Sequence, residues 1–567
     1  MLRTTIRLIA TVVILAIPLA CPAATSLWTR ELAEGVTLTQ MLETGSGTDP
    51  GCKPQFINAL TIDPKAPGVS VRTILAQDKV MNDDPIKGRE TVSSMVKRTG
   101  AVAGVNGDYH NWEGDPTGLF ILNGELVSEP YRIRPEFGIL PDGAFLFDKL
   151  VLNASATAAD GESCAITGVN RQPDGDEMIL FTPRYFSRTM TRENRTEVVV
   201  DVESGLPLRV GVPITGKVRG LRPGNWRIDP GTVILSGIAK SATFANEHLK
   251  PGSKVSIEAE LDPRETSGWE KAIYAVGSCP WIVRNGKFYM DVDEERIKPG
   301  FYDVPNPRTA VGRRADGKLV IVTVDGRQAM STGMKLSELA SLMISLGCTD
   351  AVNLDGGGST EMALAYGVLN SPSDGSERAT ATCLAVYGRP ARVPTPDFAI
   401  APEPGRVPAG AELKLGLVNT ATGLPLDPAL ASRAVWTTSG NIGAVDLSGC
   451  FHALKSHSGQ ITARVGSRTS STPVTVTSGS LSRIVANLEK GKEPNTSTLY
   501  VLLKDANFNP VKFGKVSIKV TGGMADRTEV TLNDDAFASV AITWDSAATG
   551  GQQVEVRSGE FGIVVKR

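Results

Sequence analysis

The sequence has almost no net charge, few histidines and no long apolar stretch beyond its first two dozen residues. Its 567 residues include 59 lysines and arginines against 61 aspartates and glutamates, a formal charge of −2, and four histidines. This balance argues against the basic face that a nucleic-acid-binding protein needs. No later segment reaches the roughly 18 unbroken apolar residues of a membrane-spanning helix. We therefore expect neither nucleic acid as a partner nor a transmembrane span, and a ligand that is recognised by a shaped site.

Cysteine pairs with CxxC spacing are also absent, so the sequence predicts no zinc motif. An even number of cysteines follows the N-terminal segment: Cys52, Cys164, Cys279, Cys348, Cys383 and Cys450. In an exported protein this number permits disulfides. Cys348 and Cys383 flank the richest motif region and are the first candidates for such a bond. Cys450 stands alone in another domain and is expected to be a free, buried thiol.

Residues 1–24 have the pattern of a signal peptide. Arg3 and Arg7 precede an almost wholly apolar run from Leu8 to Ala20, and small residues follow where a signal peptidase could cut. The alternatives are a buried N-terminal helix or a lipoprotein lipidated at Cys21, although the residues before Cys21 fit a lipoprotein signal poorly. The expected location is outside the cytoplasm: secreted, periplasmic or on the cell surface.

The length predicts several domains. Residues 25–390 mix short strand-like runs with a few helical stretches, which favours an α/β or α+β catalytic domain. The predicted helices are Thr91–Arg98 and a segment that starts with Ser337 as its N-cap and stops at Gly347. Predicted strands in this region are Phe56–Ile62, Val69–Leu75, Leu319–Val324 and Ala351–Leu354.

The character of the sequence changes near residue 390. A proline-rich linker at 391–397 precedes two segments, 398–478 and 480–567, with short alternating strands and no convincing helix. Strands at this spacing are typical of β-sandwiches. Both segments resemble bacterial immunoglobulin-like modules, so we expect an α/β (α+β) catalytic domain followed by two all-β modules. The modules could tether the protein to a wall or glycan, or act as spacers.

Three polar, glycine-rich clusters interrupt the catalytic domain: Gly104–His110, Asn306–Gly312 and Asn353–Thr360. In the third, a strand delivers Asp355 to its end, where Gly356, Gly357 and Gly358 allow a tight turn. Exposed amides in such a turn suit a phosphate oxygen, and Ser359 and Thr360 add hydroxyl donors. Arg378 follows and could clamp phosphate with two hydrogen bonds. The alternative is a tight structural turn that Asp355 caps.

Together the clusters resemble the phosphodiester glycosidase family, in consistent order over residues 55–388. The matching parts are NGDYH, NPRTAVG, the segment from VTVDGRQAM to NLDGGGSTEMAL, and NSPSDGSER. Residues 153–277 form an insertion-like stretch without a confident alignment. The resemblance implies a hydrolase that cleaves a sugar from a sugar-1-phosphodiester or a related linkage of a cell-surface polymer or exopolysaccharide.

The resemblance and the chemistry of the reaction together suggest residue roles. Sugar–phosphate cleavage needs a carboxylate near the anomeric carbon and cations on the leaving phosphate. Asp355 is the predicted carboxylate, Glu377 the next acid or base, and Asp325 a group that orients Arg308 or the sugar. The predicted substrate-binding residues are Arg308, Arg378, Asn106, Asp108, Gly356, Gly357, Gly358, Ser359 and Thr360.

Several alternatives stay open. Asp108 and His110 replace the glycine and aromatic residue usual in the family's first motif, and Asp108 is either a carboxylate of the site or a surface turn residue. A Ser–His–Asp triad would have to use His110. Arg308 and Asp325 could instead form a structural ion pair, and Asn106 and Asn353 could order loops or bind sugar hydroxyls.

Two other functions compete with the glycosidase. No cofactor is firmly implied, but a divalent cation is possible, because Asp108, Asp115, Asp325 and Asp355 could supply oxygen ligands to a metal-dependent phosphodiesterase. A non-catalytic glycan-binding surface protein is the other alternative. The sequence fixes neither the sugar nor its leaving group.

Overall fold

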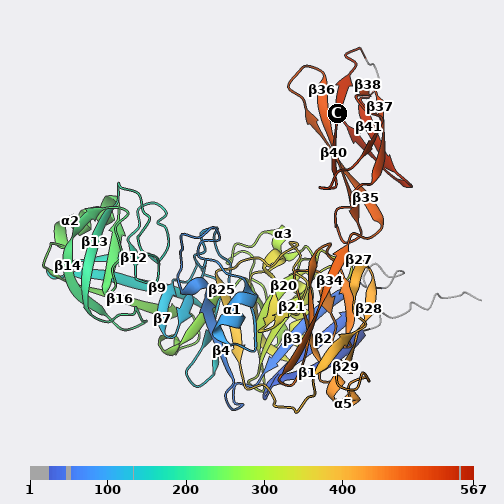
Figure 1. The fold of residues 1–567 in the computed structure, drawn as a ribbon. Coiled ribbons are helices and arrows are strands. Elements are labelled where there is room, and N and C mark those ends of the chain that lie inside the picture. The colour runs from blue at the N-terminus through green and yellow to red at the C-terminus, as the bar shows by residue number, and fades with distance from the viewer. Residues whose placement is uncertain (1–24, 46–52, 132, 548–550) are drawn as a thin grey trace, which may run out of the picture.

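The computed structural model describes residues 25–45, 53–131, 133–547 and 551–567. The predicted signal peptide with Cys21, and also Cys52, lie outside these residues. Figure 1 shows a central body, a lobe of green strands on one side, and the red C-terminal module projecting from the body. Among the described helices, none is long and apolar enough to cross a membrane.

Antiparallel sheets dominate the central body, so the expected α/β (α+β) class is confirmed only in part: strands greatly outnumber the helices. The first sheet has eight strands in the order β1-β2-β3-β21-β20-β22-β18-β19. Its strands are β1 (Thr25–Ala33), β2 (Val36–Glu43), β3 (Gln55–Ile62), β21 (Leu319–Val324), β20 (Arg308–Arg314), β22 (Cys348–Asn353), β18 (Trp281–Arg284) and β19 (Lys287–Phe288). The apolar run of β3 is buried on both faces, which explains why it lacks the alternation of a solvent-facing strand.

The second sheet has nine strands and continues from the body into the first C-terminal module. Its order is β27-β34-β33-β30-β24-β23-β5-β25-β4. The body contributes β4 (Ser70–Leu75), β25 (Thr382–Tyr387), β5 (Ala103–Asn106), β23 (Met362–Leu364) and β24 (Gly367–Val368). The module contributes β30 (Val435–Ser439), β33 (Ser458–Val465), β34 (Arg468–Thr477) and β27 (Gly405–Pro408). The sheet therefore continues across the predicted domain boundary, where β24 pairs with β30 through Val368 and Thr438.

The insertion-like stretch forms the green lobe in Figure 1. Its long strands are β9 (Phe145–Ala158), β13 (Thr196–Ser204), β14 (Ile214–Pro223), β15 (Thr232–Gly237) and β16 (Lys254–Pro263), with α2 (Ala239–His248) packed against them. The shorter strands β8 (Pro135–Ile139), β17 (Tyr274–Gly277), β6 (Phe120–Leu122) and β7 (Glu125–Ser128) join this sheet through β9. The lobe has its own apolar core around Trp269 and Leu235.

Both helices predicted in the body are present. Helix α1 (Val92–Thr99) is capped by the Thr91 hydroxyl, which accepts the Ser94 amide, and ends at Gly100 with φ +72°. Helix α4 (Leu336–Ser345) has its N-cap two residues earlier than predicted. Lys335, not Ser337, precedes it, because the Glu338 carboxylate accepts the Lys335 amide and fixes the start there.

The C-terminal segment is a two-sheet β-structure with its own core. One sheet pairs β35 (Leu481–Lys490), β36 (Thr496–Asp505), β40 (Phe537–Trp544) and β38 (Gly523–Ala525). The other pairs β39 (Glu529–Thr531), β37 (Lys515–Thr521), β41 (Gln553–Ser558) and β42 (Phe561–Lys566). Apolar residues from both sheets, including Val501 and Val554, meet between them. The first module adds two small sheets, β26 (Phe398–Ala401) with β29 (Gly416–Asn419), and β28 (Glu412–Lys414) with β32 (Cys450–Ala453) and β31 (Gly443–Val445).

The predicted Cys348–Cys383 disulfide is wrong. Both thiols are free and buried, because Cys348 on β22 packs into the apolar cluster that contains α4, whereas Cys383 on β25 packs into a separate cluster that contains α1. Cys164 and Cys279 are also free thiols. Cys450 is free, as expected, but only half-buried.

Candidate active site

The Asn106 side chain joins all three glycine-rich clusters. It lies fully buried at the end of β5. Its Nδ2 donates to the Asp355 carbonyl oxygen at 2.6 Å, and its Oδ1 accepts the Thr309 hydroxyl at 2.8 Å and the Glu361 amide at 3.2 Å. Segments that are about 200 to 250 residues apart in the chain therefore meet around one amide side chain.

Backbone hydrogen bonds hold the same convergence. The Asp355 amide donates to the Gly107 carbonyl at 3.0 Å, and the Leu354 amide donates to the Thr309 carbonyl at 2.9 Å. Asp355 thus leaves the end of β22 between the first and second clusters. These bonds place its side chain where all three clusters end.

The Asp355 carboxylate is half-buried and surrounded by donors. Its Oδ1 accepts the Gly356 amide at 2.8 Å, and the Ser359 hydroxyl also bonds to it. Burial raises the pKa of Asp355 above its ordinary value, while the Ser359 bond and the charges of His110 and Arg378 act in the opposite direction. Asp355 is therefore a carboxylate with several hydrogen-bond and charge partners in a shielded position, as a nucleophile or base requires.

The glycine turn is tight, and most of its amides bind acceptors within the protein instead of facing an anion. Gly357 has φ +62°, which a side chain would disfavour. The Gly357 amide donates to the Pro307 carbonyl at 2.9 Å, and the Gly356 amide is already bound to Asp355. Two of the three glycine amides predicted to bind phosphate are thus used within the protein.

Two guanidinium groups flank this turn. A β-carbon placed on Gly358 would lie 2.3 Å from Arg378 Nη2, and one placed on Gly357 would lie 3.1 Å from Arg327 Nη2. Arg378 also donates from Nη1 to the Ser359 hydroxyl at 3.3 Å and pairs with Asp374. The absence of side chains at the two glycines is therefore what allows the Arg378–Asp374 pair and Arg327 to approach the turn.

Arg327 is the site residue that the sequence did not single out. It belongs to the DGR element, has φ +59°, and donates from Nε and Nη2 to the Asn306 side-chain oxygen at 3.2 and 2.9 Å. The unusual backbone conformation directs an exposed guanidinium to the turn. Its place directly after Gly326 in a matched motif was the available signal.

Arg308 is placed differently from Arg327 and Arg378. Its Nε donates to the Met334 carbonyl at 2.8 Å, and its Nη2 donates to the carbonyls of Phe301 and Val304 at 2.9 and 3.0 Å. The side chain is buried, and burial lowers its pKa to about 10. These contacts make Arg308 a brace between the start of β20 and the short helix α3 (Pro299–Tyr302).

Asp108 is buried, so the surface-turn interpretation of this residue is wrong. Its Oδ1 accepts the Tyr109 amide and its Oδ2 the Gly118 amide, both at 2.7 Å. Burial raises the pKa of Asp108 to about 7. The neighbouring Glu136 carboxyl is also buried, and burial raises its pKa too. Asp108 is a neighbour of Asp355 in the site, with both oxygens occupied.

Asp325 is a buried carboxylate that holds the loop after Asn370. Its two oxygens accept the Asn370 side-chain amide and the Ser371 backbone amide, both at 2.8 Å, rather than a guanidinium of Arg308. Burial raises the pKa of Asp325 to about 7. Asn370 in turn donates to the Thr360 carbonyl at 3.1 Å, so Asp325 fixes the start of the loop that leads to Arg378 and ties it to Thr360.

Glu377 points toward helix α1. It accepts a hydrogen bond from the Ser93 hydroxyl and bonds to the buried Glu361 carboxyl. Burial, followed by the Glu377 charge, raises the pKa of Glu361 well above its ordinary value. The structure therefore pairs Glu377 with another carboxyl on the side of the site that α1 covers.

The remaining predicted residues line or support the turn. Thr360 is buried, and its hydroxyl lies 3.5 Å from that of Thr309. Asn353 donates to the Tyr109 hydroxyl at 2.9 Å and to the Cys279 carbonyl at 2.7 Å, which is a loop-ordering role. The His110 ring donates from Nδ1 to the Asn111 carbonyl at 2.9 Å, and burial lowers its pKa.

The first module touches the loop that carries Arg378. Asn441, in the turn between β30 and β31, donates its side-chain amide to the Pro372 carbonyl at 3.2 Å. The Thr437 hydroxyl donates to the Tyr366 carbonyl at 3.2 Å. The module is thus a structural support of the site's outer loop.

We expect Asn441→Gly to loosen this loop while the module stays folded. Asn441 has φ +48°, which glycine adopts freely, so the substitution removes mainly the amide contact. The expected cost is about 1 kcal/mol in the free energy of unfolding, with a several-fold higher KM. Asn495→Gly is the matched control, because Asn495 also has a positive φ of 60° but lies in the second module. An unchanged KM for Asn441→Gly would show that the module does not support the site.

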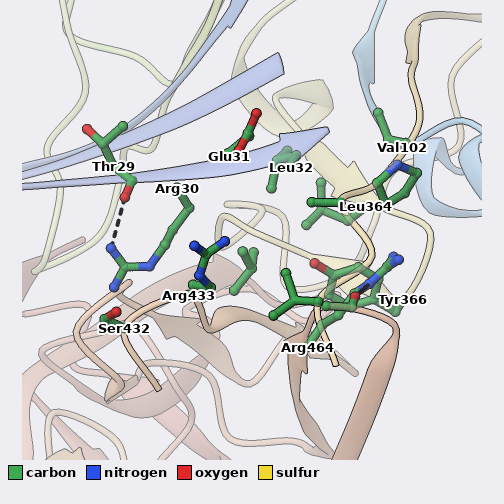
Figure 2. Close-up of a pocket in the computed structure, with 15 residues that line it drawn as sticks. Thr29, Arg30, Glu31, Leu32, Val102, Leu364, Tyr366, Ser432, Arg433 and Arg464 are labelled. Atoms are coloured by element: carbon green, nitrogen blue, oxygen red, sulfur yellow. Dashed lines mark hydrogen bonds between the residues drawn. The ribbon is translucent and has the colours of Figure 1, made fainter. Parts of the chain in front are cut away.

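A crevice elsewhere on the surface separates the body from the first module. Figure 2 shows it between the hairpin of β1 and the first module, with Arg30, Arg433 and Arg464 on its walls. Its volume is about 330 Å³. Arg30 donates to the carbonyls of Ala434 and Leu447 at 3.1 and 2.7 Å and so joins the module to the body. None of the predicted site residues lines this crevice.

Comparisons with known proteins find similarity to one family over part of the chain. Residues 210–387 match the model of the family described as phosphodiester glycosidase. The match contains the second and third clusters and part of the lobe, but not Asn106. It is thus shorter than the resemblance over 55–388, and it includes part of the stretch that could not be aligned.

Two curated relatives and one solved structure are similar to this chain. The uncharacterized SPbeta prophage-derived protein YomE of Bacillus subtilis is 46% identical over 84 residues, 15% of this chain and 13% of that protein. The N-acetylglucosamine-1-phosphodiester alpha-N-acetylglucosaminidase of Mus musculus is 34% identical over 147 residues, 24% of this chain and 26% of that protein. The chain thus aligns with about a quarter or less of these two relatives. A putative exported protein from Burkholderia pseudomallei shares the fold, with a TM-score of 0.54 and 20% identity over 65% of this chain and 97% of that one.

Proposed function

We propose that this chain, which carries a domain of the phosphodiester glycosidase family, hydrolyses the bond between a sugar's anomeric carbon and a phosphodiester. The observation that carries the proposal is the meeting of Asp355, Ser359 and Arg378 beside a glycine turn, with Arg327 close to Gly357 of the same turn. A carboxylate next to two guanidinium groups is suited to a reaction that leaves positive charge on the sugar and releases a phosphate anion.

In this mechanism Asp355 attacks the anomeric carbon or activates water toward it. Arg378 and Arg327 bind the phosphate oxygens and stabilise the negative charge that grows as the carbon–oxygen bond breaks. Ser359 links the two functions, since its hydroxyl bonds to Asp355 and accepts from Arg378. Asp325 acts as a positioning residue through Asn370 and Ser371.

Contacts of the carboxylates favour the glycosidase over a metal-dependent phosphodiesterase. Both oxygens of Asp108 and both oxygens of Asp325 accept N–H donors, which competes with binding a cation. Of the four aspartates that could supply oxygen ligands to a hard cation, two thereby already bind N–H groups of the protein with both oxygens. The glycan-binding alternative predicts affinity for glycan without release of any sugar.

The substrate is proposed to be a sugar-1-phosphodiester of a cell-surface polymer or exopolysaccharide, and the protein is proposed to act outside the cytoplasm. The export-type N-terminus supports the location. The modules, immunoglobulin-like by sequence pattern, are proposed to bring the enzyme to a wall or glycan.

A panel of α- and β-linked sugar-1-phosphodiesters tests the proposal. The expected products are a free reducing sugar and a phosphomonoester, with turnover that survives a chelator. Release of a sugar-1-phosphate that stops on chelation would favour the phosphodiesterase. Binding without any product would favour the non-catalytic alternative.

We expect substitutions of the three arginines to separate into two classes. Arg378→Ala and Arg327→Ala each lower kcat/KM by roughly 10²-fold, because each removes a charged donor from the leaving phosphate. Arg308→Lys mainly lowers the melting temperature, because lysine cannot satisfy three carbonyls with the geometry of a guanidinium. Steady-state kinetics and thermal unfolding of the same preparations distinguish the classes. A large kinetic defect in Arg308→Lys with none in Arg327→Ala would reverse the assignment.

A further inference from the structure

The first module contains a cluster of side chains with the composition of a transition-metal site. Glu412 lies on β28, and Cys450 and His452 lie on the neighbouring strand β32. Glu412 is directly opposite His452 in the ladder, and Cys450 and His452, two residues apart, face the same side. One ligand atom from each residue lies within 4.8 Å of the other two. The sheet register therefore creates the cluster, without the CxxC spacing whose absence argued against a zinc motif.

The distance between His452 and Glu412 agrees with two ligands that share one ion. His452 Nδ1 and Glu412 Oε1 are 3.3 Å apart. Ligands with bonds of about 2.1 Å at a tetrahedral ion are separated by roughly 3.4 Å. A thiolate, an imidazole and a carboxylate together favour Zn²⁺ over Mg²⁺ or Ca²⁺, which prefer oxygen ligands only. The fourth position would be left for water.

A second carboxylate completes the pattern of a metal-binding histidine. His452 Nε2 lies 3.2 Å from Asp446 Oδ2, on the ring edge opposite Glu412. Histidines that bind metals usually donate their other N–H to a carboxylate, which fixes the ring and its tautomer. Asp446 is buried and held by the Ser448 and Cys450 amides at 2.9 and 3.0 Å, so it is a fixed acceptor.

Charges around the cluster leave the ion's position accessible. The Glu412 side chain is 69% exposed, while those of His452 and Asp446 are almost fully buried. Lys414 lies opposite Cys450, but its Nζ is bound to the Ser448 carbonyl at 2.5 Å and hydroxyl at 3.0 Å. The ammonium is thus tied to the loop, and a cation can enter from the solvent side of Glu412.

We propose that Glu412, Cys450 and His452 bind one Zn²⁺ ion, with Asp446 orienting the histidine. The ion would brace the loop that attaches this module to the catalytic body. Leu447, next to Asp446, donates its amide to Gln40 Oε1 at 2.7 Å and accepts from Arg30 Nη2 at 2.7 Å. The site would thus lie at a domain junction, and it is independent of the proposed glycosidase activity.

Metal titration of the full chain tests this inference. After treatment with a chelator, the protein is expected to bind one Zn²⁺ per chain and to show a higher melting temperature with Zn²⁺ than without it. Co²⁺ in place of Zn²⁺ should give a sulfur-to-metal charge-transfer band. Cys450→Ser should abolish that band, and Asp446→Asn should weaken Zn²⁺ binding by roughly 10- to 100-fold.

Matched variants guard against unfolding as an explanation. Glu412→Gln changes an exposed side chain and should weaken binding at least 10-fold while the metal-free melting temperature stays the same. Cys164→Ser removes another free, partly exposed thiol and should leave both the band and the affinity unchanged. Absence of stoichiometric binding, or equal binding by wild type, Cys450→Ser and Glu412→Gln, would show that His452 is merely paired with two carboxylates.

Discussion

Asp355→Asn is expected to lower kcat by at least roughly 10²-fold, and by more if Asp355 is a covalent nucleophile. The amide keeps the size of the side chain and one oxygen, which can still accept the Gly356 amide now bound at 2.8 Å. It loses the negative charge that the developing positive charge on the sugar requires. Kinetics on the best substrate of the sugar-1-phosphodiester panel measure this loss.

The fold of the Asp355→Asn variant should be intact. Its melting temperature and far-ultraviolet circular dichroism should match those of wild type, because the backbone bond to Gly107 and the Asn106 contact involve main-chain atoms of residue 355. Asp262→Asn offers a control, since Asp262 is an exposed carboxylate on β16 in the lobe and takes no part in the proposed site. Retained turnover in Asp355→Asn would refute the role of this carboxylate.

Asn106→Ala is expected to reduce the free energy of unfolding by about 3 kcal/mol, the largest stability effect that we predict. The substitution removes three hydrogen bonds and leaves the Thr309 hydroxyl and the Glu361 amide without their buried acceptor. Activity should fall with stability, because the same side chain holds the Asp355 backbone. Urea unfolding followed by fluorescence measures the change.

Asn153→Ala is the matched control for Asn106→Ala. Asn153 is exposed on β9 in the lobe, where the same truncation should cost less than about 0.5 kcal/mol. A small loss in the free energy of unfolding for Asn106→Ala would mean that other contacts hold the three clusters together.

Local patterns in the sequence were sufficient to predict many of the elements. Buried strands such as Leu319–Val324 have the predicted bounds, because an apolar run between turn residues has few alternatives. Helix α1 follows from its Thr91 cap and Gly100 stop. The relation between elements did not follow: antiparallel pairing and the sheet that runs on into the first module depend on long-range register, which no local pattern encodes.

The same division applies to the candidate site. Asp355, Ser359 and Arg378 could be chosen from the sequence, because a strand, three glycines and hydroxyl residues form a recognisable local unit. The roles of Arg308 and Arg327 could not be distinguished, since both belong to polar motifs. Only the tertiary contacts show that the Arg308 guanidinium binds backbone carbonyls while that of Arg327 lies beside the glycine turn. The disulfide prediction failed for a similar reason, as proximity to a motif in the sequence does not place two thiols in the same apolar cluster.

Hydrolysis of a sugar-1-phosphodiester in water labelled with oxygen-18 tests the central claim most directly. Cleavage at the anomeric carbon, with Asp355 acting on that carbon, places the label on the sugar's C1 hydroxyl and none on the phosphate. Mass spectrometry of the two products reads out this difference. Label in the phosphate would mean that water attacks phosphorus, and the glycosidase account would be wrong.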